Sequence, residues 1–279
     1  MKRLILLLIF ITVSQLIQAQ SAWTKKKGEG FTQLSFSSIA NYNNQFGSPD
    51  YQTERTITDN TIQLYTEYGL TDKTTLIASV PFKILKAGDA TFSNTIPITN
   101  NGSNNALGNI ELGLKHNFYN KKWVISGQLN IEANTGNYDT KTGLRTGYDT
   151  WTLTPTLNIG RGFTDFYIQG FTGVNARFNN YSSNFRIGGE AGYKTFKRLW
   201  IVAYLDVVSS FKNEKDTNLP IENLLTGTYV NNQEFTAYGL KALLEITQKI
   251  GLTASFGGAF SGNNVAKRAA VNFGVYTKF

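Results

Sequence analysis

Most of this sequence alternates, residue by residue, between apolar side chains and polar or small ones, and twelve segments share the pattern. In one of them, Ile110, Leu112 and Leu114 alternate with Glu111 and Lys115. Successive side chains of a β-strand point to opposite faces, so the alternation predicts strands with one apolar and one polar face. The predicted strands cover residues 31–42, 61–70, 75–84, 110–118, 122–133, 151–159, 166–178, 185–193, 199–211, 238–246, 250–260 and 265–279.

The connections between these segments are alternately short and long. The short ones are 71–73, 120–122, 162–164, 196–198 and 247–249, and the long polar ones are 43–59, 86–108, 136–149 and 212–233, with two brief connections near Asn179 and Gly262. Short turns at one end and longer loops at the other are typical of outer-membrane barrels, which have an even number of antiparallel strands. The sequence therefore predicts an all-β fold, a closed antiparallel up-and-down transmembrane β-barrel of about 12 strands. Both termini are then expected at the short-turn, periplasmic end.

The N-terminus has the features of a secretory signal peptide. Lys2 and Arg3 precede a predominantly apolar run of ten residues, 4–13, in which only Thr12 is polar, and Ala19 supplies a small residue for cleavage. We predict a signal peptide at 1–19 and an outer-membrane barrel at 20–279. The alternative, a membrane anchor, needs about 20 apolar residues. The richest later segment, 199–208, is interrupted by Asp206. An exported chain of this kind would enter a membrane only as strands, so we expect it in the cell outer membrane of a Gram-negative-type bacterium, with outer-membrane lipid around it.

The outward face holds nearly all the large apolar residues, and its aromatic residues gather near the strand ends. Aromatic rings prefer the headgroup level of a membrane, so two aromatic girdles are expected. The periplasmic girdle is predicted to contain Tyr68, Phe118, Trp123, Phe166 and Tyr193, and the opposite girdle Tyr42, Phe82, Trp151, Phe178, Phe185, Phe211 and Phe260.

The opposite, polar face is predicted to line the lumen. Both signs of charge occur on it in similar number, which favours ion pairs or hydration over isolated buried charges. Height and strand adjacency suggest that Asp206 lies beside Lys241 and that Lys83 lies near Glu111. The predicted lumen-lining set is Glu67, Lys83, Glu111, Lys115, Glu132, Arg177, Arg186, Glu190, Lys194, Asp206, Lys241, Glu245 and Arg268.

Three further residues bear on the wall of the barrel. Pro81 and Pro155 each forfeit a ladder hydrogen bond, so an irregularity near a loop is expected at Pro81 and a local bulge at Pro155. The chain ends at Phe279, on the same face as Val271, Phe273 and Val275. This resembles the C-terminal strand that the barrel assembly machinery reads in outer-membrane proteins, although Thr277 stands where that pattern often has an aromatic residue.

Two stretches carry a resemblance to a known family. The segment from Tyr68 to Phe82, and the segment from Leu107 to His116, are similar to the outer-membrane proteins called the MetA-pathway-of-phenol-degradation family. The family tends to have Gly-Asp where this chain has Gly108-Asn109. The resemblance implies an outer-membrane transport barrel, associated in some members with uptake of small hydrophobic or aromatic compounds. The substrate itself does not carry over.

Groups suited to catalysis or metal binding are scarce. The chain has no Cys and a single His, His116, which falls on the outward face. Glu111 and Glu132 could form an acid/base pair. A simpler explanation is that they are two lumenal charges, neutralised by Lys83 or hydrated by water. We predict no catalytic residue, metal or cofactor. The formal charge of +8 includes one basic run, at residues 25–27, which a solubilising role or nearby anionic headgroups would explain, so no nucleic-acid partner is expected.

The expected bore indicates the function. Eight strands leave an interior filled by side chains and sixteen or more leave an aqueous channel, so about 12 should give a narrow lumen that loops 86–108 and 212–233 can occlude. We predict a channel or carrier for passive transport of small solutes, with hydrophobic or aromatic ones as candidates. The alternative is a barrel that anchors extracellular loops for surface binding or a structural role. An outer-membrane hydrolase is the third reading.

Overall fold

The structure is a computed structural model that describes residues 21–215 and 219–279; the predicted signal peptide lies outside these residues. The elements are β1 (Gly30–Phe46), β2 (Tyr51–Thr71), β3 (Thr74–Ala90), β4 (Gly102–Leu107), β5 (Ile110–Asn120), β6 (Val124–Ala133), β7 (Thr152–Gly162), β8 (Phe166–Arg177), β9 (Asn184–Thr195), β10 (Leu199–Ser210), α1 (Ile221–Thr226), β11 (Glu234–Glu245), β12 (Ile250–Asn263), β13 (Val265–Ala266) and β14 (Ala270–Lys278). No helix within the described part is long and apolar enough to cross a membrane.

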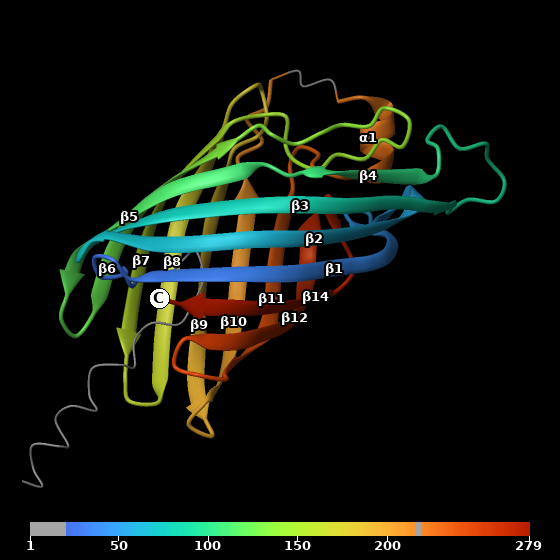
Figure 1. The fold of residues 1–279 in the computed structure, drawn as a ribbon. Helices are drawn as coiled ribbons and strands as arrows, with labels where there is room; N and C mark the ends of the chain where they lie inside the picture. Colours follow the sequence, from blue (N-terminus) through green and yellow to red (C-terminus); the bar gives the residue numbers. More distant parts are fainter. Residues whose placement is uncertain (1–20, 216–218) are drawn as a thin grey trace, which may run out of the picture.

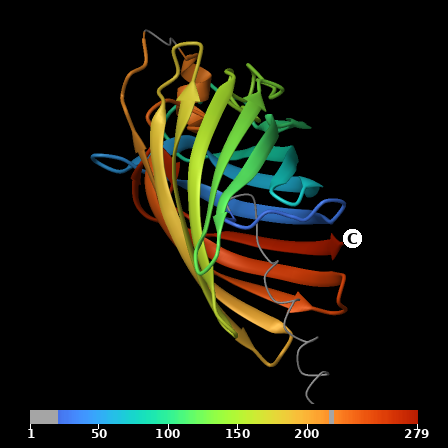
Figure 2. The ribbon, with the colours of Figure 1, turned by 90° about the vertical axis from the view of Figure 1, so that its left-hand side faces the viewer.

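Sequence neighbours pair with each other all the way around the sheet, and the sheet closes on itself (Figure 1). The closing pair is β1 with β14, in antiparallel register from Phe31 opposite Lys278 to Ser38 opposite Val271. The blue β1 and the red β14 lie side by side in Figure 2. The short strand β4 precedes β5 and pairs with the same neighbour, β3, so the two act as one interrupted strand. In the same way β13 precedes β14, and both pair with β1. The prediction of a closed, 12-stranded, antiparallel up-and-down barrel is confirmed.

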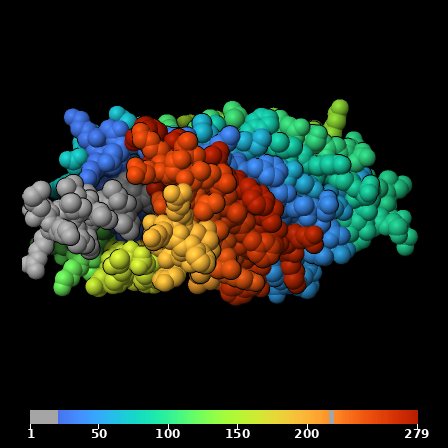
Figure 3. All heavy atoms as spheres, turned by 60° about the horizontal axis from the view of Figure 1, so that its bottom comes forward, coloured from blue at the N-terminus to red at the C-terminus, as the bar shows by residue number. Residues whose placement is uncertain are grey.

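The alternating pattern places large apolar side chains on the outside of the wall. Leu112, Leu129 and Leu240 are 56%, 46% and 58% exposed, and nothing in the described chain covers them. Figure 3 shows the C-terminal strands, orange to red, forming one continuous outer face. Water-soluble monomers rarely expose apolar surface on this scale, whereas hydrocarbon covers such a belt in an outer-membrane barrel.

Two irregularities explain the prolines in the wall. Pro81 lies where the partner of β3 changes from β5 to β4, and its carbonyl accepts the Gly108 N–H at 2.8 Å. Pro155 pairs with Leu129 of β6, but the ladder between β7 and β8 passes from Leu153 directly to Thr156. The irregularity expected at Pro81 is therefore present. At Pro155 the expected bulge is wrong: the ladder has a gap, but the register is the same on both sides of it.

Two side chains differ from their predicted placement. Tyr42 was expected in the outer girdle, but a register shift between Ile39 and Tyr42, with Asn41 at φ 49°, changes the phase of β1. Tyr42 is consequently 7% exposed and packs inside with Ile57 and Leu85. Arg268 was expected in the lumen wall, but it is exposed in the break between β13 and β14. The ladder of β14 with β12 begins only at Ala270, so the strand phase does not extend to Arg268.

Candidate functional site

The interior of the barrel carries charged side chains that are paired with one another. At the periplasmic end, the Glu67 carboxylate accepts from Lys115 Nζ at 3.0 Å and lies 3.3 Å from Lys25 Nζ. Tyr65 donates its hydroxyl to the same carboxylate at 2.8 Å. Glu67 and Lys115 are fully buried, so each charge depends on the others for solvation.

Further pairs follow along the lumen. Lys241 lies 2.7 Å from Glu190, and Arg186 lies 3.5 Å from Asp206. Glu245 lies between Lys194 at 3.5 Å and Lys278 at 3.2 Å. Lys83 lies 2.6 Å from Asp59.

The closest partners of these charges differ from the two predicted pairings, although Lys241 and Asp206 line the same cavity. In the β10–β11 register, Lys241 stands opposite Val202, two inward positions below Asp206, and it reaches Glu190 instead. Glu111 stands opposite Ser79, two inward positions below Lys83. Stagger between neighbouring strands decides which charges meet, and the alternation pattern alone does not give that stagger.

Two of the predicted lumen-lining carboxylates lie side by side in the wall. Glu111 and Glu132 face each other in the register of β5 and β6, and Asn109 donates to Glu132 at 2.8 Å. His116 is exposed on the outer wall, where its Nδ1 lies 2.9 Å from the Thr74 hydroxyl, away from these carboxylates. Eleven of the twelve predicted girdle side chains, all but Tyr42, are between 36% and 67% exposed; they are Tyr68, Phe82, Phe118, Trp123, Trp151, Phe166, Phe178, Phe185, Tyr193, Phe211 and Phe260.

A cavity of about 360 Å³ lies in the middle of the lumen, and we call it the chamber. Residues of strands β1, β2, β8 to β12 and β14 line it. Its polar lining consists of Gln33, Ser35, Gln63, Gln169, Glu190, Asp206, Lys241, Ser255 and Asn272, and its aromatic lining of Tyr65, Phe171 and Tyr204. The charges among these residues were predicted to line the lumen, but the amides, hydroxyls and aromatic rings were not singled out.

Two of the rings approach the wall closely because glycines lie beside them. A Cβ at Gly239 or at Gly257 would lie 2.3 Å from the Tyr204 hydroxyl oxygen, and a Cβ at Gly188 would lie 2.7 Å from the Phe171 ring. Only glycine permits so close an approach. The rings therefore occupy little of the bore and leave the chamber open.

The N-terminal segment, residues 21–27, lies inside the periplasmic end of the lumen, and we call it the plug. Its backbone crosses the barrel from one wall to the other: the Lys25 N–H donates to Thr75 of β3 at 2.7 Å, and the Ala22 N–H donates to Gln169 of β8 at 3.2 Å. Ser21 and Ala22 are buried. The basic run at 25–27 was interpreted as a solubilising segment or one near anionic headgroups, so its burial in the lumen was not predicted.

Aromatic packing holds the same segment against the wall. Trp23 makes an edge contact with Tyr167, whose ring lies 5.4 Å from that of Trp200. Gly160 of β7 provides the space, since a Cβ there would lie 2.8 Å from the Trp23 ring. The sequence feature that could have indicated this packing is Trp23, an aromatic residue that precedes the first predicted strand.

The opposite end of the lumen is covered by two loops that hold each other. Leu144, from the loop between β6 and β7, is fully buried against inward residues of β1 to β3. Its neighbour Arg145 donates to Asn223 of α1 at 2.9 Å, and its N–H donates to Thr228 at 3.0 Å. Tyr229 continues this cover toward the wall, with Lys83 Nζ 5.6 Å from its ring. These contacts hold the described part of 219–233, with α1, against the loop of Leu144 at the extracellular end.

The other loop expected to occlude the lumen projects away from it instead. Residues 86–90 continue β3 and residues 102–107 form β4, and the loop of residues 91–101 extends beyond the barrel (Figure 1). Glu54 accepts the N–H groups of Ile98 at 2.7 Å and Thr99 at 2.8 Å, which anchors one side of this loop. Ile96 is 95% exposed at its tip.

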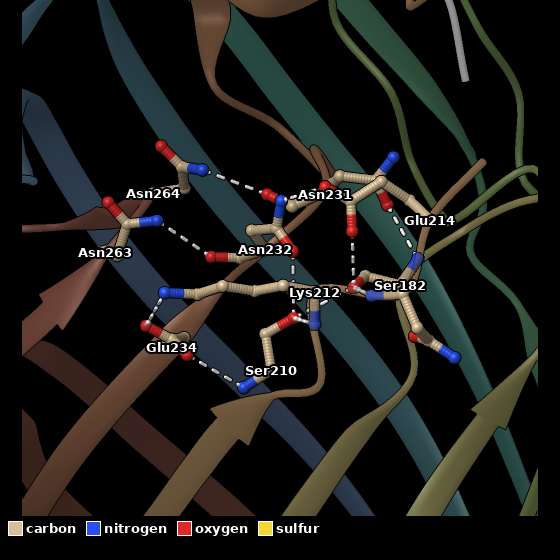
Figure 4. A network of polar contacts seen from close by, with 10 residues as sticks. Ser182, Ser210, Lys212, Glu214, Asn231, Asn232, Glu234, Asn263 and Asn264 are labelled. Carbon is tan, nitrogen blue, oxygen red and sulfur yellow. Dashed lines mark hydrogen bonds and ion pairs between the residues drawn. The ribbon is translucent and has the colours of Figure 1, made fainter. Parts of the chain in front are cut away.

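A polar network fastens the extracellular ends of β8 to β13 together (Figure 4). Glu214 accepts from Ser182 at 2.9 Å and from Asn232, while Ser210 donates to Asn232 at 2.9 Å. Asn263 and Asn264 donate to the backbone of residues 232 and 231. The hydrogen bond from Asn232, followed by that from Ser182, holds the pKa of the Glu214 carboxyl below its ordinary value of 4.5.

This network should weaken in acid. Because the pKa of Glu214 is lower in the folded protein, its contribution is complete above about pH 4.5 and is lost as pH falls through the folded-state pKa. We expect amide hydrogen exchange in residues 211–215, corrected for the intrinsic rate, to accelerate severalfold between pH 6 and pH 3. Glu214→Gln should show no such step, and an identical step in this variant would contradict the assignment.

Comparison with solved structures places the fold among outer-membrane barrels. The COG4313 outer-membrane channel from Pseudomonas putida F1 superposes with a TM-score of 0.71 at 14% identity, over 95% of this chain and 100% of that one. The NanC porin superposes with a TM-score of 0.53 at 8% sequence identity, over 89% of this chain and 100% of the porin. The translocator domain of the autotransporter NalP from Neisseria meningitidis superposes with a TM-score of 0.53 at 10% sequence identity, over 91% of this chain and 90% of that domain.

At these identities the likeness concerns the fold alone. The fold defines a closed barrel of the outer-membrane type, a class that includes porins, channels and autotransporter translocators. No family model matches the sequence, and no curated protein does. Membership of the MetA-pathway-of-phenol-degradation family therefore stays a prediction.

Proposed function

We propose that this protein is an outer-membrane channel or carrier through which small solutes pass passively, and that its own chain closes the lumen at both ends. The observation that carries the proposal is the chamber, a cavity of about 360 Å³ inside a barrel wall, lined by polar and aromatic side chains. Ligand sites are typically cavities of this kind, from about 300 Å³ upward. A barrel that served only as an anchor would gain nothing from an open, solute-sized interior.

The proposal includes the export and assembly steps expected from the sequence. Cleavage after Ala19 would leave a mature chain whose first described residues form the plug. Phe279 lies at the closing seam, where it exchanges backbone hydrogen bonds with Gly30 at 2.8 and 3.1 Å. This position is compatible with a recognition signal for the assembly machinery, since β14 must be placed before β1 can close the barrel.

Liposome swelling tests transport directly. Proteoliposomes that contain the full mature chain should swell in isosmotic solutions of small solutes faster than protein-free liposomes. The same preparation in planar bilayers should give small, infrequent current steps, because both ends of the lumen are covered. Absence of swelling and of current at every voltage, also after removal of the plug, would exclude a channel.

The projecting loop between β3 and β4 supports a second candidate, surface binding. Ile96 and Ile98 are 95% and 59% exposed, an unusual position for two isoleucines in a polar loop. Deletion of residues 92–97 leaves the Glu54 anchor in place. We expect this deletion to leave swelling rates unchanged within about twofold, since the loop does not cover the mouth. A large rise in swelling would instead make this loop part of the closure.

A further inference from the structure

We propose that the chamber binds a small, uncharged ring compound that carries several hydroxyl groups, a solute of monosaccharide size, in preference to ions and hydrocarbons. The inference rests on the proposed function and names the class of solute for the same lumen. Three features of the chamber carry it: the pairing of its charges, the distribution of its polar groups and the position of its aromatic rings.

The charged side chains of the chamber already satisfy one another. Glu190 accepts from Tyr167 at 2.9 Å and from Gln169 and Lys241 at 2.7 Å each. Asp206 is paired with Arg186 at 3.5 Å. An anion would have to displace Glu190 from Lys241, and a cation would have to displace Arg186 from Asp206. Breaking a desolvated pair in this way is costly, so the site favours an uncharged solute.

Neutral polar groups approach the chamber from many sides. Gln33 and Ser35 come from β1, Gln63 from β2, Ser255 from β12 and Asn272 from β14. Amides and hydroxyls both donate and accept, as sugar hydroxyls do. Asp206 Oδ1 is buried without a hydrogen-bond partner in the described structure, so it offers an open acceptor. A hydrocarbon in this cavity would leave such groups unpaired, at a cost for each.

The rings supply the apolar part of the site. Tyr204 and Phe171 pack against glycines of the wall. Lys241 Nζ lies over the Tyr204 ring, 5.1 Å from its centroid, and the Arg186 guanidinium lies over the Phe171 ring at 5.6 Å, while the rest of each side chain borders the chamber. A saturated sugar ring has apolar C–H faces and a hydroxylated rim. It therefore combines contacts to an aromatic ring with hydrogen bonds around its edge, which matches a chamber with rings on the wall and amides between them.

Equilibrium dialysis of radiolabelled D-glucose against the full mature chain in detergent tests the proposal without requiring transport. We expect one saturable site with millimolar affinity, displaced by unlabelled glucose and by other neutral pyranoses. Sodium gluconate and benzene should not displace the label. Catechol, which carries its hydroxyls on one edge only, should compete at least tenfold more weakly than glucose.

Two asparagine variants serve as a matched pair. Asn272→Leu removes a polar group from the chamber and should weaken glucose binding at least tenfold. Asn158→Leu makes the same change at a buried position of β7 that does not line the chamber, and it should leave the affinity within twofold.

The outcomes separate this inference from the proposed function. Saturable glucose binding without swelling of proteoliposomes would support the proposed solute class and exclude the proposed transport function. Swelling without saturable glucose binding would keep transport and overturn the solute class. Equal competition by gluconate, benzene or catechol, or equal weakening by the two asparagine variants, would also overturn it.

Discussion

Removal of residues 21–27 should raise the conductance of the barrel in planar bilayers by about tenfold or more, because pore dimensions and lining control ion passage. The deletion keeps Ala19 and Gln20, so the predicted cleavage site stays intact. The segment crosses the periplasmic opening from Thr75 to Gln169, and Trp23 fills the space in front of Gly160. After the deletion, the segment that crosses the periplasmic opening is missing. Unchanged conductance would show that the plug does not limit passage.

A reversible lock provides the control for this deletion. The chain has no native cysteine, so a disulfide between Ala22→Cys and Gly160→Cys would form without competitors. A Cβ at Gly160 would lie 3.0 Å from that of Ala22, somewhat closer than the about 3.5–4.5 Å of disulfides, and 2.8 Å from the Trp23 ring. Both cysteines are therefore introduced into a Trp23→Ala parent, in which that ring no longer occupies the space. The oxidised double variant should lose the infrequent openings of the parent, and reduction should restore them. Each single variant should respond to neither treatment.

The faces of the strands were predictable because the surroundings of a barrel impose them. Leu112 and Leu129 must face the outside and Glu67 and Lys115 the inside wherever strands separate an apolar medium from a polar interior. The alternation therefore indicated the sheet, its closure and the outward position of His116. Tyr42 escaped the rule because a bulge shifts the phase locally, and a bulge leaves no clear mark on the sequence.

Contacts between distant segments were not predictable in the same way. Lys241 meets Glu190 and not Asp206 because of strand stagger, which the pattern of a single strand does not contain. The plug and the loop of Leu144 have no repeating pattern, and their burial depends on partners far along the chain, such as Gln169 for Ala22 and Asn223 for Arg145. Loop length indicated which segments could close the lumen, but not which of them turn inward.

Glu67→Gln should lower the free energy of unfolding by about 3–5 kcal/mol, the usual cost of removing one partner from a buried ion pair. Glu67 is 1% exposed and is shared by the buried Lys115 and Lys25. Glutamine has nearly the volume of glutamate and can still accept the hydrogen bond from Tyr65. The loss of stability therefore measures the effect of removing the negative charge. Two ammonium groups then remain together, away from water, with no counter-charge. Urea unfolding of the barrel refolded into detergent or lipid, followed by intrinsic fluorescence, measures the change.

The charge argument also predicts a rescue and a change in gating. Glu67→Gln combined with Lys115→Met removes the carboxylate together with its fully buried partner, so we expect the double variant to recover more than half of the lost stability. Lys25 belongs to the plug, and Glu67→Gln should therefore also increase the frequency of openings in planar bilayers. A loss below about 1 kcal/mol, typical of exposed pairs, would contradict desolvation of the cluster. A double variant no more stable than Glu67→Gln would place the cost in packing rather than in unpaired charge, and the plug would then be held mainly by Trp23.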